Sequence, residues 1–553
     1  MSQSALKTVS IDPIAEPIAA LADSAHAATV RDGLARNVGF DFAARVGYLV
    51  SRVFIPPFVL ARIGISAYGL WSTVFILVSY VGMSTFGINA VYVKYVAEFS
   101  ARGDYRKANS LLSTGLATSS TLCLAIFAAV MLAWPHLMLW LNVPRNLHRE
   151  AREVVLMVVA IFLCDMTFSV FSDALSGAQK IAEVQIIWVI AYLVEAACIF
   201  YLVGTGHGIV GMAEAFMIRT VLSIALSVVV AFRMLPWLRI SPRLFSRRSI
   251  STLVNFGGVV QLGAVISIAL STVERVIGAP LIGLSAVAVL DISDKLPTMA
   301  CSIPLGFASA FLPAASYLQG GLENVSSGHD TIVKLYLRGA RYMNLTASSM
   351  TGFMAVTSGP LLAVWIGKLY PGTAYLMAIF AVQQHLHMMT GPGTSILKGL
   401  GRPREEFLYS VPNLLLLAVT IPLSRIVLGH WSAVGLGSAV VVATSIAAIG
   451  FIIHANRLLA VPPRRYLKYV VMPSLLPYLV GGCFAIPAWM FVSHLTRLQG
   501  AALIATIGTL YAITLALIVD RGVFEPQERL WFHQNIRGGL RRFLPAFWIG
   551  DLS

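Results

Sequence analysis

The sequence predicts an all-α polytopic membrane protein with about fourteen transmembrane helices. Of its 553 residues, 57% are hydrophobic and 12% are charged, whereas a soluble globular domain carries about 25% charged residues. Apolar runs of about 20 residues, long enough to cross a bilayer, recur along most of the chain. The basic residues that give the net charge of +15 are gathered in the short loops between these runs. That pattern indicates contact with anionic lipid rather than with nucleic acid.

The spans are placed by apolar length and by the polar residues that interrupt it. In order, they are expected at 37–61, 68–95, 109–134, 152–175, 183–203, 208–234, 252–277, 285–317, 340–366, 374–397, 406–427, 431–455, 468–493 and 499–519. The eighth contains Pro297, Pro304 and Pro313, so we expect a broken helix there.

The loops alternate in charge, and this fixes the expected orientation. Loops that follow even-numbered spans are rich in Lys and Arg, as in LPWLRISPRLFSRRS at 235–249, and most loops on the other side are poor in them. The positive-inside rule then places both termini in the cytosol. The first residues interrupt their apolar positions with Asp, Glu and Pro, which is typical of a retained tail rather than a signal peptide.

An internal repeat divides the chain into two halves. IGISAYGLW at 63–71 returns as IGLSAVAVL at 282–290, an offset of 219 residues. DALSGAQKIAEV at 173–184 is echoed by SILKGLGRPREEF at 395–407, with Gly177 and Gly399 equivalent at an offset of 222. Six spans per half gives both halves the same orientation, so a pseudo-two-fold axis along the membrane normal is expected.

The expected domain organisation follows from the spans and the repeat. It comprises a cytosolic tail (1–35), an N-lobe (36–234), a basic cytosolic linker (235–250), a C-lobe (251–457), two further helices (458–519) and a cytosolic amphipathic tail (520–553). Two lobes with a site between them are typical of transporters. No outer loop is long enough for an external catalytic domain, so the chain is predicted not to be an enzyme.

The first span carries charges that a membrane helix rarely tolerates. In GFDFAARVGYLVSRVF (39–54), Arg45 and Arg52 lie about 40° and 20° from Asp41 around a helix. Each charge at the bilayer centre costs roughly 2.5–3.5 kcal/mol, so this face must meet protein or water. Asp41 can pair with Arg45 at i+4. Arg52 has no partner on its own helix, and its planar donors suit a phosphate.

Further charges fall inside or at the ends of other spans. They are Lys94, Glu214, Arg219, Glu274, Arg275, Asp291, Asp294 and Lys295. Lys94 can snorkel to the cytosolic interface. For the others, internal ion pairs that fix helix packing and a functional site are both open interpretations. We take Arg219 and Arg275 as candidate substrate-binding cations and the carboxylates, with Asp41, as candidates for coupling or internal pairing.

The thiols and histidines give no sign of a metal site. The five cysteines lie in apolar segments without a CxxC pair, which predicts buried, inert thiols. His385 and His387 are two residues apart and would point about 200° from each other on a helix, whereas a zinc pair needs i+4 spacing. No metal or cofactor is expected.

Several of these motifs resemble those of a known family. Four stretches resemble Wzx-type polysaccharide flippases. They are the run that begins ARNVGFDFAARVGYLVSRVF and continues through ARGD, LSGAQKIAEVQ after span 4, LLAVWIGKLYPGTAY after span 9 and LKGLGRPREEF after span 10. These belong to the multidrug/oligosaccharidyl-lipid/polysaccharide exporter superfamily. The likeness runs over most of residues 33–460 and does not cover the tail from 520.

The resemblance implies movement of an undecaprenyl-diphosphate-linked oligosaccharide to the outer leaflet of the bacterial inner membrane. It also implies a role in exopolysaccharide, O-antigen or capsule assembly beside a polymerase. By position, Arg45, Arg52 and Lys94 match the arginines that line the N-terminal lobe of related lipid II flippases, with Lys in place of the third Arg. Fourteen helices favour this lipid-linked branch, and a proton or sodium ion is the candidate coupling ion.

Three alternatives remain. A cation-coupled multidrug exporter of the same superfamily predicts drug sensitivity on deletion with normal surface polysaccharide. An integral-membrane glycosyltransferase or polymerase predicts altered linkage or chain length with transport intact. A non-transporting scaffold for an envelope synthase predicts that loss of Arg52 is silent.

Overall fold

The computed structural model describes residues 53–78, 88–247, 249–251, 253, 270, 272–321, 328–524, 526 and 528–529. All regular elements in these residues are helices, which confirms the all-α class. Nine of the described helices are long and apolar enough to cross a membrane, and a bent pair adds a tenth. The chain is therefore a multi-pass membrane protein, and the count of fourteen stays a prediction.

The chain forms two compact units, and each unit combines stretches that are not consecutive in the sequence. Unit 1 contains the described residues of Val78–Trp134 and Arg152–Ala264, together with residues 53–55. Unit 2 contains Val265–Ser553 together with two earlier stretches, Pro56–Leu77 and Pro135–Ala151. Parts of the N-terminal sequence repeat therefore pack with the C-terminal half.

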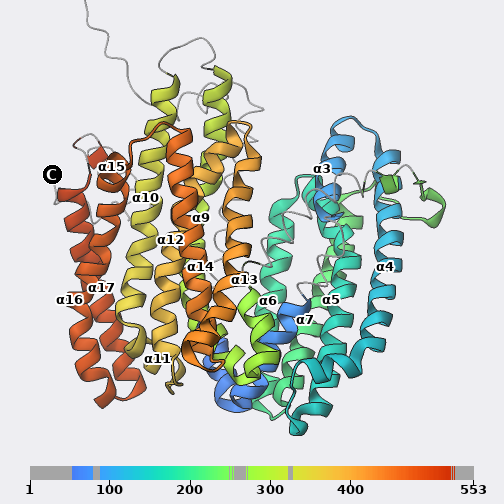
Figure 1. The fold of residues 1–553 in the computed structure, drawn as a ribbon. Coiled ribbons are helices and arrows are strands. Elements are labelled where there is room, and N and C mark those ends of the chain that lie inside the picture. The colour runs from blue at the N-terminus through green and yellow to red at the C-terminus, as the bar shows by residue number, and fades with distance from the viewer. Residues whose placement is uncertain are drawn as a thin grey trace, which may run out of the picture. The chain divides into compact units, whose positions relative to one another are not determined.

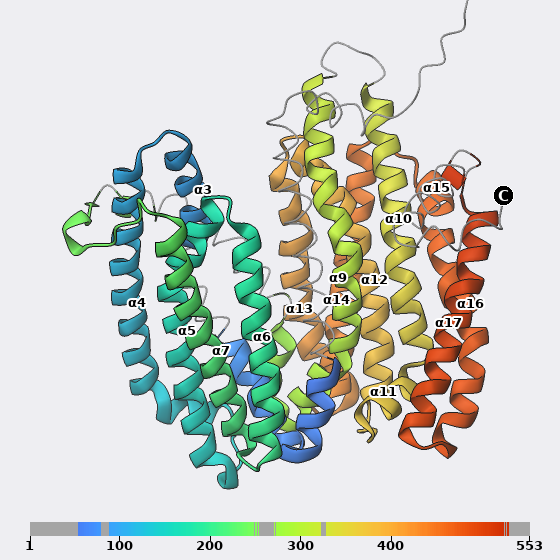
Figure 2. The ribbon, with the colours of Figure 1, turned by 180° about the vertical axis from the view of Figure 1, so that it is seen from behind.

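Unit 1 is a helical bundle built around one apolar core. Its elements are α3 (Ile88–Ala101), α4 (Tyr105–Trp140, as far as Trp134), α5 (His148–Gly177, from Arg152), α6 (Ile181–Gly204) and α7 (Gly208–Met234). Figure 2 shows α4 to α7 as long rods. Tyr92, Leu112 and Val170 are fully buried in the core that α3, α4, α5 and α7 share. Pairing apolar faces in this way buries the residues that do not face lipid.

The basic linker is held against α4 rather than left as a free tether. Asn109 donates from Nδ2 to the carbonyl of Trp237 at 2.7 Å and accepts from the amide of Arg239 at 2.9 Å. One position further along α4, the Ser110 hydroxyl donates to the carbonyl of Leu244 at 2.8 Å. A polar stripe at the start of α4 thus satisfies linker groups that lack helical partners.

Unit 2 contains the C-terminal helices. After the helical residues 272–282, they are α9 (Leu284–Gly321), α10 (Gly328–Val356), α11 (Ser358–Ile366), α12 (Thr373–Gly399), α13 (Phe407–Leu428), α14 (Ala433–Leu458), α15 (Pro463–Tyr466), a π-helical turn (Leu467–Val471), α16 (Met472–Phe491) and α17 (Arg497–Gly522). In Figure 1, α12 stands among α9, α10 and α14, and it packs against all three. It is therefore the central helix of the unit.

The turn expected between the first two spans takes an unexpected form. Residues 62–67 were expected to connect two helices, but they belong to the helical stretch Val53–Val78, so the connection is confined to a turn at Gly64. Gly64, inside this helix, has φ +78°. The equivalent residue of the second repeat, Gly283, has φ +97° and separates residues 272–282 from α9. Both repeats thus use a left-handed glycine, the residue that adopts this conformation without steric cost.

The prolines of the eighth span do not break it. α9 is one helix from Leu284 to Gly321, so the expected interruption is wrong. In membrane helices, neighbouring groups can satisfy the carbonyls that proline releases. The break lies instead in the ninth span, where α10 and α11 meet at 79° around Thr357.

Pro360 explains the position of this break. In a continuous helix its ring would collide with the carbonyl of Val356, four residues earlier, and α10 ends at Val356. The released carbonyl accepts a hydrogen bond of 2.8 Å from Trp489 Nε1 on α16. The indole also fills the space beside Gly359, where a Cβ would overlap it. At the other end of α11, the Arg497 guanidinium donates to the carbonyls of Val364 and Trp365.

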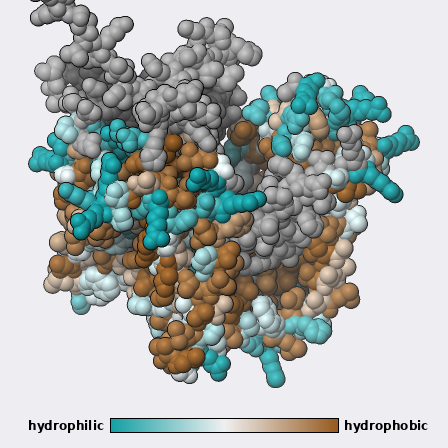
Figure 3. Space-filling model, turned by 45° about the horizontal axis from the view of Figure 1, so that its top comes forward, coloured by the Kyte–Doolittle hydropathy of each residue, from teal (hydrophilic) through white to brown (hydrophobic). Residues whose placement is uncertain are grey.

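The outer surface of the helices suits a lipid environment. Leu132, Ile426 and Leu479 are large apolar residues that stand exposed on α4, α13 and α16. Figure 3 shows hydrophobic side chains along the helix flanks, with hydrophilic side chains gathered nearer the ends. Cys164 and Cys483 are also exposed, so the expectation of buried thiols is wrong for these two.

Candidate functional site

The two repeats contact each other through equivalent residues. The hydroxyl oxygens of Ser66 and Ser285 lie 2.9 Å apart, and the two residues are separated by 219 positions, the offset of the repeat. A contact between equivalent residues is the signature of an isologous, two-fold interface. Gly69 lies against the backbone of Leu284 so closely that a Cβ would overlap its carbonyl oxygen. We call this contact, formed by residues 64–69 and 283–285, the paired turns.

A third segment joins the paired turns. Asn142, between α4 and α5, donates from Nδ2 to the carbonyl of Pro280 at 2.8 Å. Asn142 itself has a left-handed backbone, with φ +48°, which asparagine tolerates better than most residues. All of these residues belong to unit 2. Two segments of the first repeat, residues 64–69 and Asn142, therefore contact the second repeat near Gly283.

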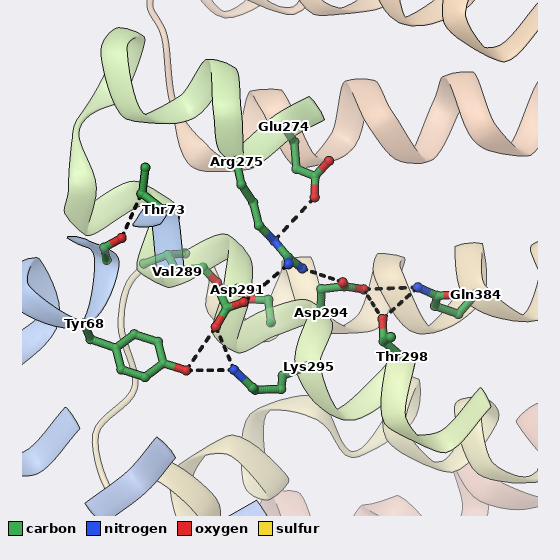
Figure 4. A network of polar contacts seen from close by, with 12 residues as sticks. Tyr68, Thr73, Glu274, Arg275, Val289, Asp291, Asp294, Lys295, Thr298 and Gln384 are labelled. Carbon is green, nitrogen blue, oxygen red and sulfur yellow. Dashed lines mark hydrogen bonds and ion pairs between the residues drawn. The ribbon is translucent and has the colours of Figure 1, made fainter. Parts of the chain in front are cut away.

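Immediately beyond the paired turns lies a buried cluster of charges, shown in Figure 4. Arg275 is at its centre and touches three carboxylates. Its Nη2 donates to Asp294 at 2.6 Å, its Nη1 lies 3.4 Å from Asp291, and its Nε lies 3.5 Å from Glu274. Glu274 and Asp291 are 5% and 8% exposed, so little water reaches their charges. The arginine compensates most of the cost of burying them.

Lys295 and Tyr68 close the side of the cluster nearest the paired turns. Lys295 Nζ donates to Asp291 Oδ2 at 3.0 Å and to the Tyr68 hydroxyl at 3.1 Å. The Tyr68 hydroxyl donates in turn to the same Asp291 oxygen at 3.0 Å. Tyr68 is 3% exposed and comes from the helix Val53–Val78, so the cluster includes a side chain from each repeat.

The opposite side of the cluster is neutral and comes from Thr298 on α9 and Gln384 on α12. Gln384 Nε2 donates to Thr298 at 2.9 Å and to Asp294 at 3.3 Å, and the Thr298 hydroxyl donates to Asp294 at 3.0 Å. These groups satisfy the second oxygen of Asp294, which Arg275 does not contact. We call the set of Tyr68, Glu274, Arg275, Asp291, Asp294, Lys295, Thr298 and Gln384 the charge cluster.

Among the described residues, the charges of this cluster do not balance. Glu274, Asp291 and Asp294 face two cations, Arg275 and Lys295. With all five ionised, the residues drawn in Figure 4 carry one net negative charge. Ionisable groups at membrane depth are costly and usually functional. A proton or a small cation would neutralise the excess, which makes the cluster a candidate coupling site.

Unit 1 contains a separate buried pair. Arg219 on α7 lies 3.6 Å from Glu195 on α6, and both side chains are about nine-tenths buried. The guanidinium carbon stands 4.6 Å and 4.9 Å from the ring centres of Phe216 and Tyr192. Arg219 is therefore held by Glu195 and by two aromatic faces.

The remaining predicted site residues lie in different settings. Glu214 is partly exposed and pairs with His207 at 3.0 Å rather than with Arg219. Lys94 is exposed on α3, with Nζ 4.8 Å from the ring centre of Tyr95. Asp41, Arg45 and Arg52 lie outside the described residues. Arg219 and Arg275 are engaged with carboxylates, so their use for a phosphate requires these pairs to open.

The partners that complete both charged sites were missed from the sequence. Glu195 lies in an apolar run beside no other charge, and Tyr68 and Gln384 are uncharged. A lone carboxylate in a predicted span is a detectable signal for Glu195. Tyr68 offered none beyond its place in the segment IGISAYGLW, whose counterpart in the second half has Val287 at this position.

The two neighbouring histidines take different partners. His385 Nδ1 lies 3.1 Å from the Tyr478 hydroxyl on α16, and His387 Nδ1 lies 2.9 Å from the Tyr409 hydroxyl on α13. Their rings therefore point to different helices, as the i, i+2 spacing predicts.

Comparison with known proteins was made on sequence and on structure. No protein-family model matches the chain. The uncharacterized membrane protein EpsK of Bacillus subtilis strain 168 is 23% identical over 337 residues, which cover 60% of this chain and 64% of EpsK. This chain thus spans slightly less than two thirds of that relative.

Two solved structures are similar over most of the chain. A multidrug resistance MATE family transporter of the MOP superfamily, in an inward-facing conformation, has a TM-score of 0.61 at 16% identity, covering 76% of this chain and 94% of the transporter. The lipid II flippase MurJ, in an inward closed conformation, has a TM-score of 0.61 at 13% identity, covering 88% of this chain and 98% of MurJ. The chain has the fold that these two proteins share.

This shared fold confirms the predicted fold class. These solved relatives are transporters rather than enzymes. At such low identities the likeness establishes the fold and leaves the substrate to be argued from the residues.

Proposed function

We propose that this protein flips an undecaprenyl-diphosphate-linked oligosaccharide from the cytosolic to the outer leaflet of the bacterial inner membrane. The observation that carries the proposal is the structural likeness to a lipid II flippase, which extends over 88% of the chain. The flippase-like motifs and the charged face of the first span support the same substrate class. The delivered unit would then be joined into exopolysaccharide, O-antigen or capsule by a polymerase on the outer side.

The headgroup is the part of such a substrate that cannot cross hydrocarbon unaided. Its diphosphate is doubly anionic, and arginine guanidinium groups bind phosphate in a planar, bidentate manner. Arg45 and Arg52 are the proposed capture residues, and Lys94 is a third cation on α3. The polyprenyl tail would stay in lipid while the headgroup passes between the lobes.

The paired turns are the proposed outer closure of the transport path. With both termini in the cytosol, the turn at Gly64 falls on the outer side, as does its repeat equivalent at Gly283. Rocking of the two repeats would separate Ser66 from Ser285, which now lie 2.9 Å apart. Contact between small polar residues can open at low energetic cost, since water can replace each hydrogen bond.

Release of the headgroup requires a source of free energy. The charge cluster, with three carboxylates against two cations, is the proposed place where a proton or sodium ion is coupled. Glu274, Asp291 and Asp294 are the candidate binding groups, and Glu214 in unit 1 is a further candidate. Loading proteoliposomes with labelled substrate and collapsing each gradient in turn tests this step, and unchanged rates would remove coupling.

A deletion strain tests the function itself. It carries wild-type protein, Arg45→Ala/Arg52→Ala, or Arg62→Ala as a matched control, because Arg62 is an exposed arginine further along the same segment. The strains are compared at equal expression by extracting undecaprenyl-linked oligosaccharides and assaying surface polymer. We expect cytosolic accumulation with loss of polymer in the double variant only.

A multidrug exporter is the second candidate, since the MATE transporter has the same TM-score as MurJ. It predicts that deletion leaves lipid-linked pools and polymer normal and sensitises cells to drugs. Longer coverage of this chain by MurJ, 88% against 76%, favours the flippase. Normal lipid pools in the deletion strain would reverse that preference.

A further inference from the structure

Tyr68 occupies a special place in the charge cluster. Its hydroxyl donates to Asp291 Oδ2 at 3.0 Å and accepts from Lys295 Nζ at 3.1 Å, while these two residues also contact each other. The three groups therefore form a closed triangle. Figure 4 shows the tyrosine approaching the cluster from a different chain segment than Asp291 and Lys295, which share α9.

The same tyrosine is tied to the paired turns. It lies two residues after Ser66 and one before Gly69, and both of these contact the start of α9. A helix moves as a rigid element over so short a distance. Any motion that separates Ser66 from Ser285 therefore also withdraws the Tyr68 hydroxyl from Asp291 and Lys295.

Withdrawal changes the cluster in a defined way. Asp291 loses a donor, and Lys295 loses an acceptor and an aromatic ring whose centre lies 5.7 Å from Nζ. Buried charges that lose hydrogen bonds are destabilised unless a proton, an ion or water replaces the partner. The affinity of the cluster for a cation must then differ between the closed and open states of the paired turns.

We propose that Tyr68 is a positioning residue that links closure of the paired turns to cation occupancy of the charge cluster. Because such coupling is reciprocal, a cation that changes the cluster shifts closure by the same factor by which closure shifts cation affinity. In the part of the chain that the structure describes, the titratable and charged groups that face Tyr68 are Asp291 and Lys295 on α9, with Glu274, Arg275 and Asp294 behind them. The contribution of α12 is the neutral Gln384. This link rests on the proposed movement of the repeats and not on the identity of the substrate.

The test uses the full-length chain with the Ser66→Cys/Ser285→Cys pair as a closure reporter. Crosslinking rates are measured in native membranes across about pH 5.5–8.5 and with Na⁺ or K⁺, in otherwise identical chains with or without Tyr68→Phe. We expect Tyr68→Phe to slow crosslinking roughly tenfold, because two hydrogen bonds to charged groups are lost. Because thiolate formation alone raises the rate with pH, each crosslinking rate is divided by the rate at which a small thiol reagent modifies the Ser66→Cys single variant under the same conditions. We expect Tyr68→Phe to abolish the dependence of this normalised rate on pH or Na⁺ that the parent pair shows.

Two companion variants keep the test decisive. Tyr511→Phe removes a hydroxyl that donates to the carbonyl of Ser349 at 2.8 Å, in the same unit and away from the paired turns. It should leave both the rate and its cation dependence unchanged. Lys295→Gln removes the other arm of the triangle and should reproduce Tyr68→Phe, which covers the case in which the phenylalanine variant does not accumulate.

Two results would overturn the link: a cation dependence that persists after Tyr68→Phe, or a parent pair whose crosslinking is independent of both pH and Na⁺. Neither result bears on flipping, which is assayed separately through lipid-linked oligosaccharide pools. Conversely, normal pools in a deletion strain would remove the proposed substrate and leave the Tyr68 link standing.

Discussion

Ser66 and Ser285 are equivalent residues of two sequence repeats, and their hydroxyl oxygens lie 2.9 Å apart. A contact between equivalent positions lies on the local two-fold axis of an isologous interface. The left-handed glycines two residues before them, Gly64 and Gly283, are equivalent as well. An internal repeat that is weak in the sequence is therefore expressed as a physical contact at one point of the fold.

The first prediction concerns this contact. The Ser66→Cys/Ser285→Cys pair should form a disulfide under mild oxidation and stop transport, because a covalent bond prevents the paired turns from opening. Reductant should restore activity. Transport is assayed by measuring surface polymer and lipid-linked oligosaccharide pools. The variants are made in a protein that also carries Cys164→Ser, Cys198→Ser and Cys483→Ser, because these thiols are not buried.

A second cysteine pair serves as the control. A Cβ built at Gly393 on α12 lies 3.3 Å from Cβ of Ala455 on α14, within the C-terminal repeat, which is close to the separation in a disulfide. Crosslinking Gly393→Cys/Ala455→Cys should leave transport intact, because both residues move together. Loss of transport in the control pair, or full activity in an oxidised Ser66→Cys/Ser285→Cys chain, would contradict a moving contact at the paired turns.

The second prediction concerns Gly69. A Cβ at this position would overlap the carbonyl oxygen of Leu284, which is backbone and cannot rotate away. Gly69→Ala should therefore prevent close approach of the paired turns at a cost of about 1–3 kcal/mol, and it should slow crosslinking of the reporter pair. Gly482→Ala on α16 is the control, since a Cβ there meets nothing within 4 Å. Equal crosslinking in the two variants would show that the turns do not pack through Gly69.

The third prediction concerns Arg275. Arg275→Gln leaves Glu274, Asp291 and Asp294 without their shared counter-charge, so thermal unfolding of the purified protein should occur at a lower temperature. Breaking a buried pair typically costs about 3–5 kcal/mol. Adding Asp294→Asn to Arg275→Gln removes one carboxylate and should recover part of that loss.

An exposed arginine, Arg62, provides the control for the Arg275→Gln variant. Arg62→Gln should change the unfolding temperature little, because surface ion pairs and exposed arginines contribute about 0–1 kcal/mol. An Arg275→Gln protein as stable as Arg62→Gln would mean that the three carboxylates are not charged together in the folded state.

The helices themselves could be predicted closely from the sequence. The sixth span was expected at 208–234, and α7 runs from Gly208 to Met234; the fifth was expected at 183–203, and α6 runs from Ile181 to Gly204. A bilayer imposes a minimum apolar length, and polar residues mark where the chain leaves it. These signals are local, so one sequence is enough to find them.

Breaks and partners were not predictable in the same way. The prolines predicted a break in the eighth span, which forms α9, and none in the ninth. In the structure α9 is continuous, and the ninth span is broken between α10 and α11. Whether proline interrupts a helix depends on which distant group satisfies the released carbonyl, here Trp489 for Val356. Likewise, Asp291 and Lys295 are four residues apart, a spacing that places them on one face of a helix, but their partner Tyr68 lies 223 residues from Asp291. No local pattern encodes such a pairing.

The last prediction concerns the packing of α17 against the short helix α11. Arg497 on α17 donates from Nε to the carbonyl of Val364 at 2.8 Å and also contacts the carbonyl of Trp365. Arg497→Gln should leave both carbonyls without this donor, at roughly 1–3 kcal/mol. Because α11 has nine residues and cannot be stable alone, the loss should appear as faster amide exchange in residues 358–366.

The same amide-exchange experiment includes a control variant and can contradict the prediction. Arg425→Gln, an exposed arginine whose guanidinium carbon lies 5.6 Å from the Trp431 ring centre, should leave exchange in α11 unchanged. Faster exchange throughout unit 2 in the Arg497→Gln protein would indicate global destabilisation instead of release of one helix. Unchanged exchange in residues 358–366 would mean that Trp489 alone holds α11. Faster exchange confined to α11 would therefore show that α17 stabilises the broken span through Arg497.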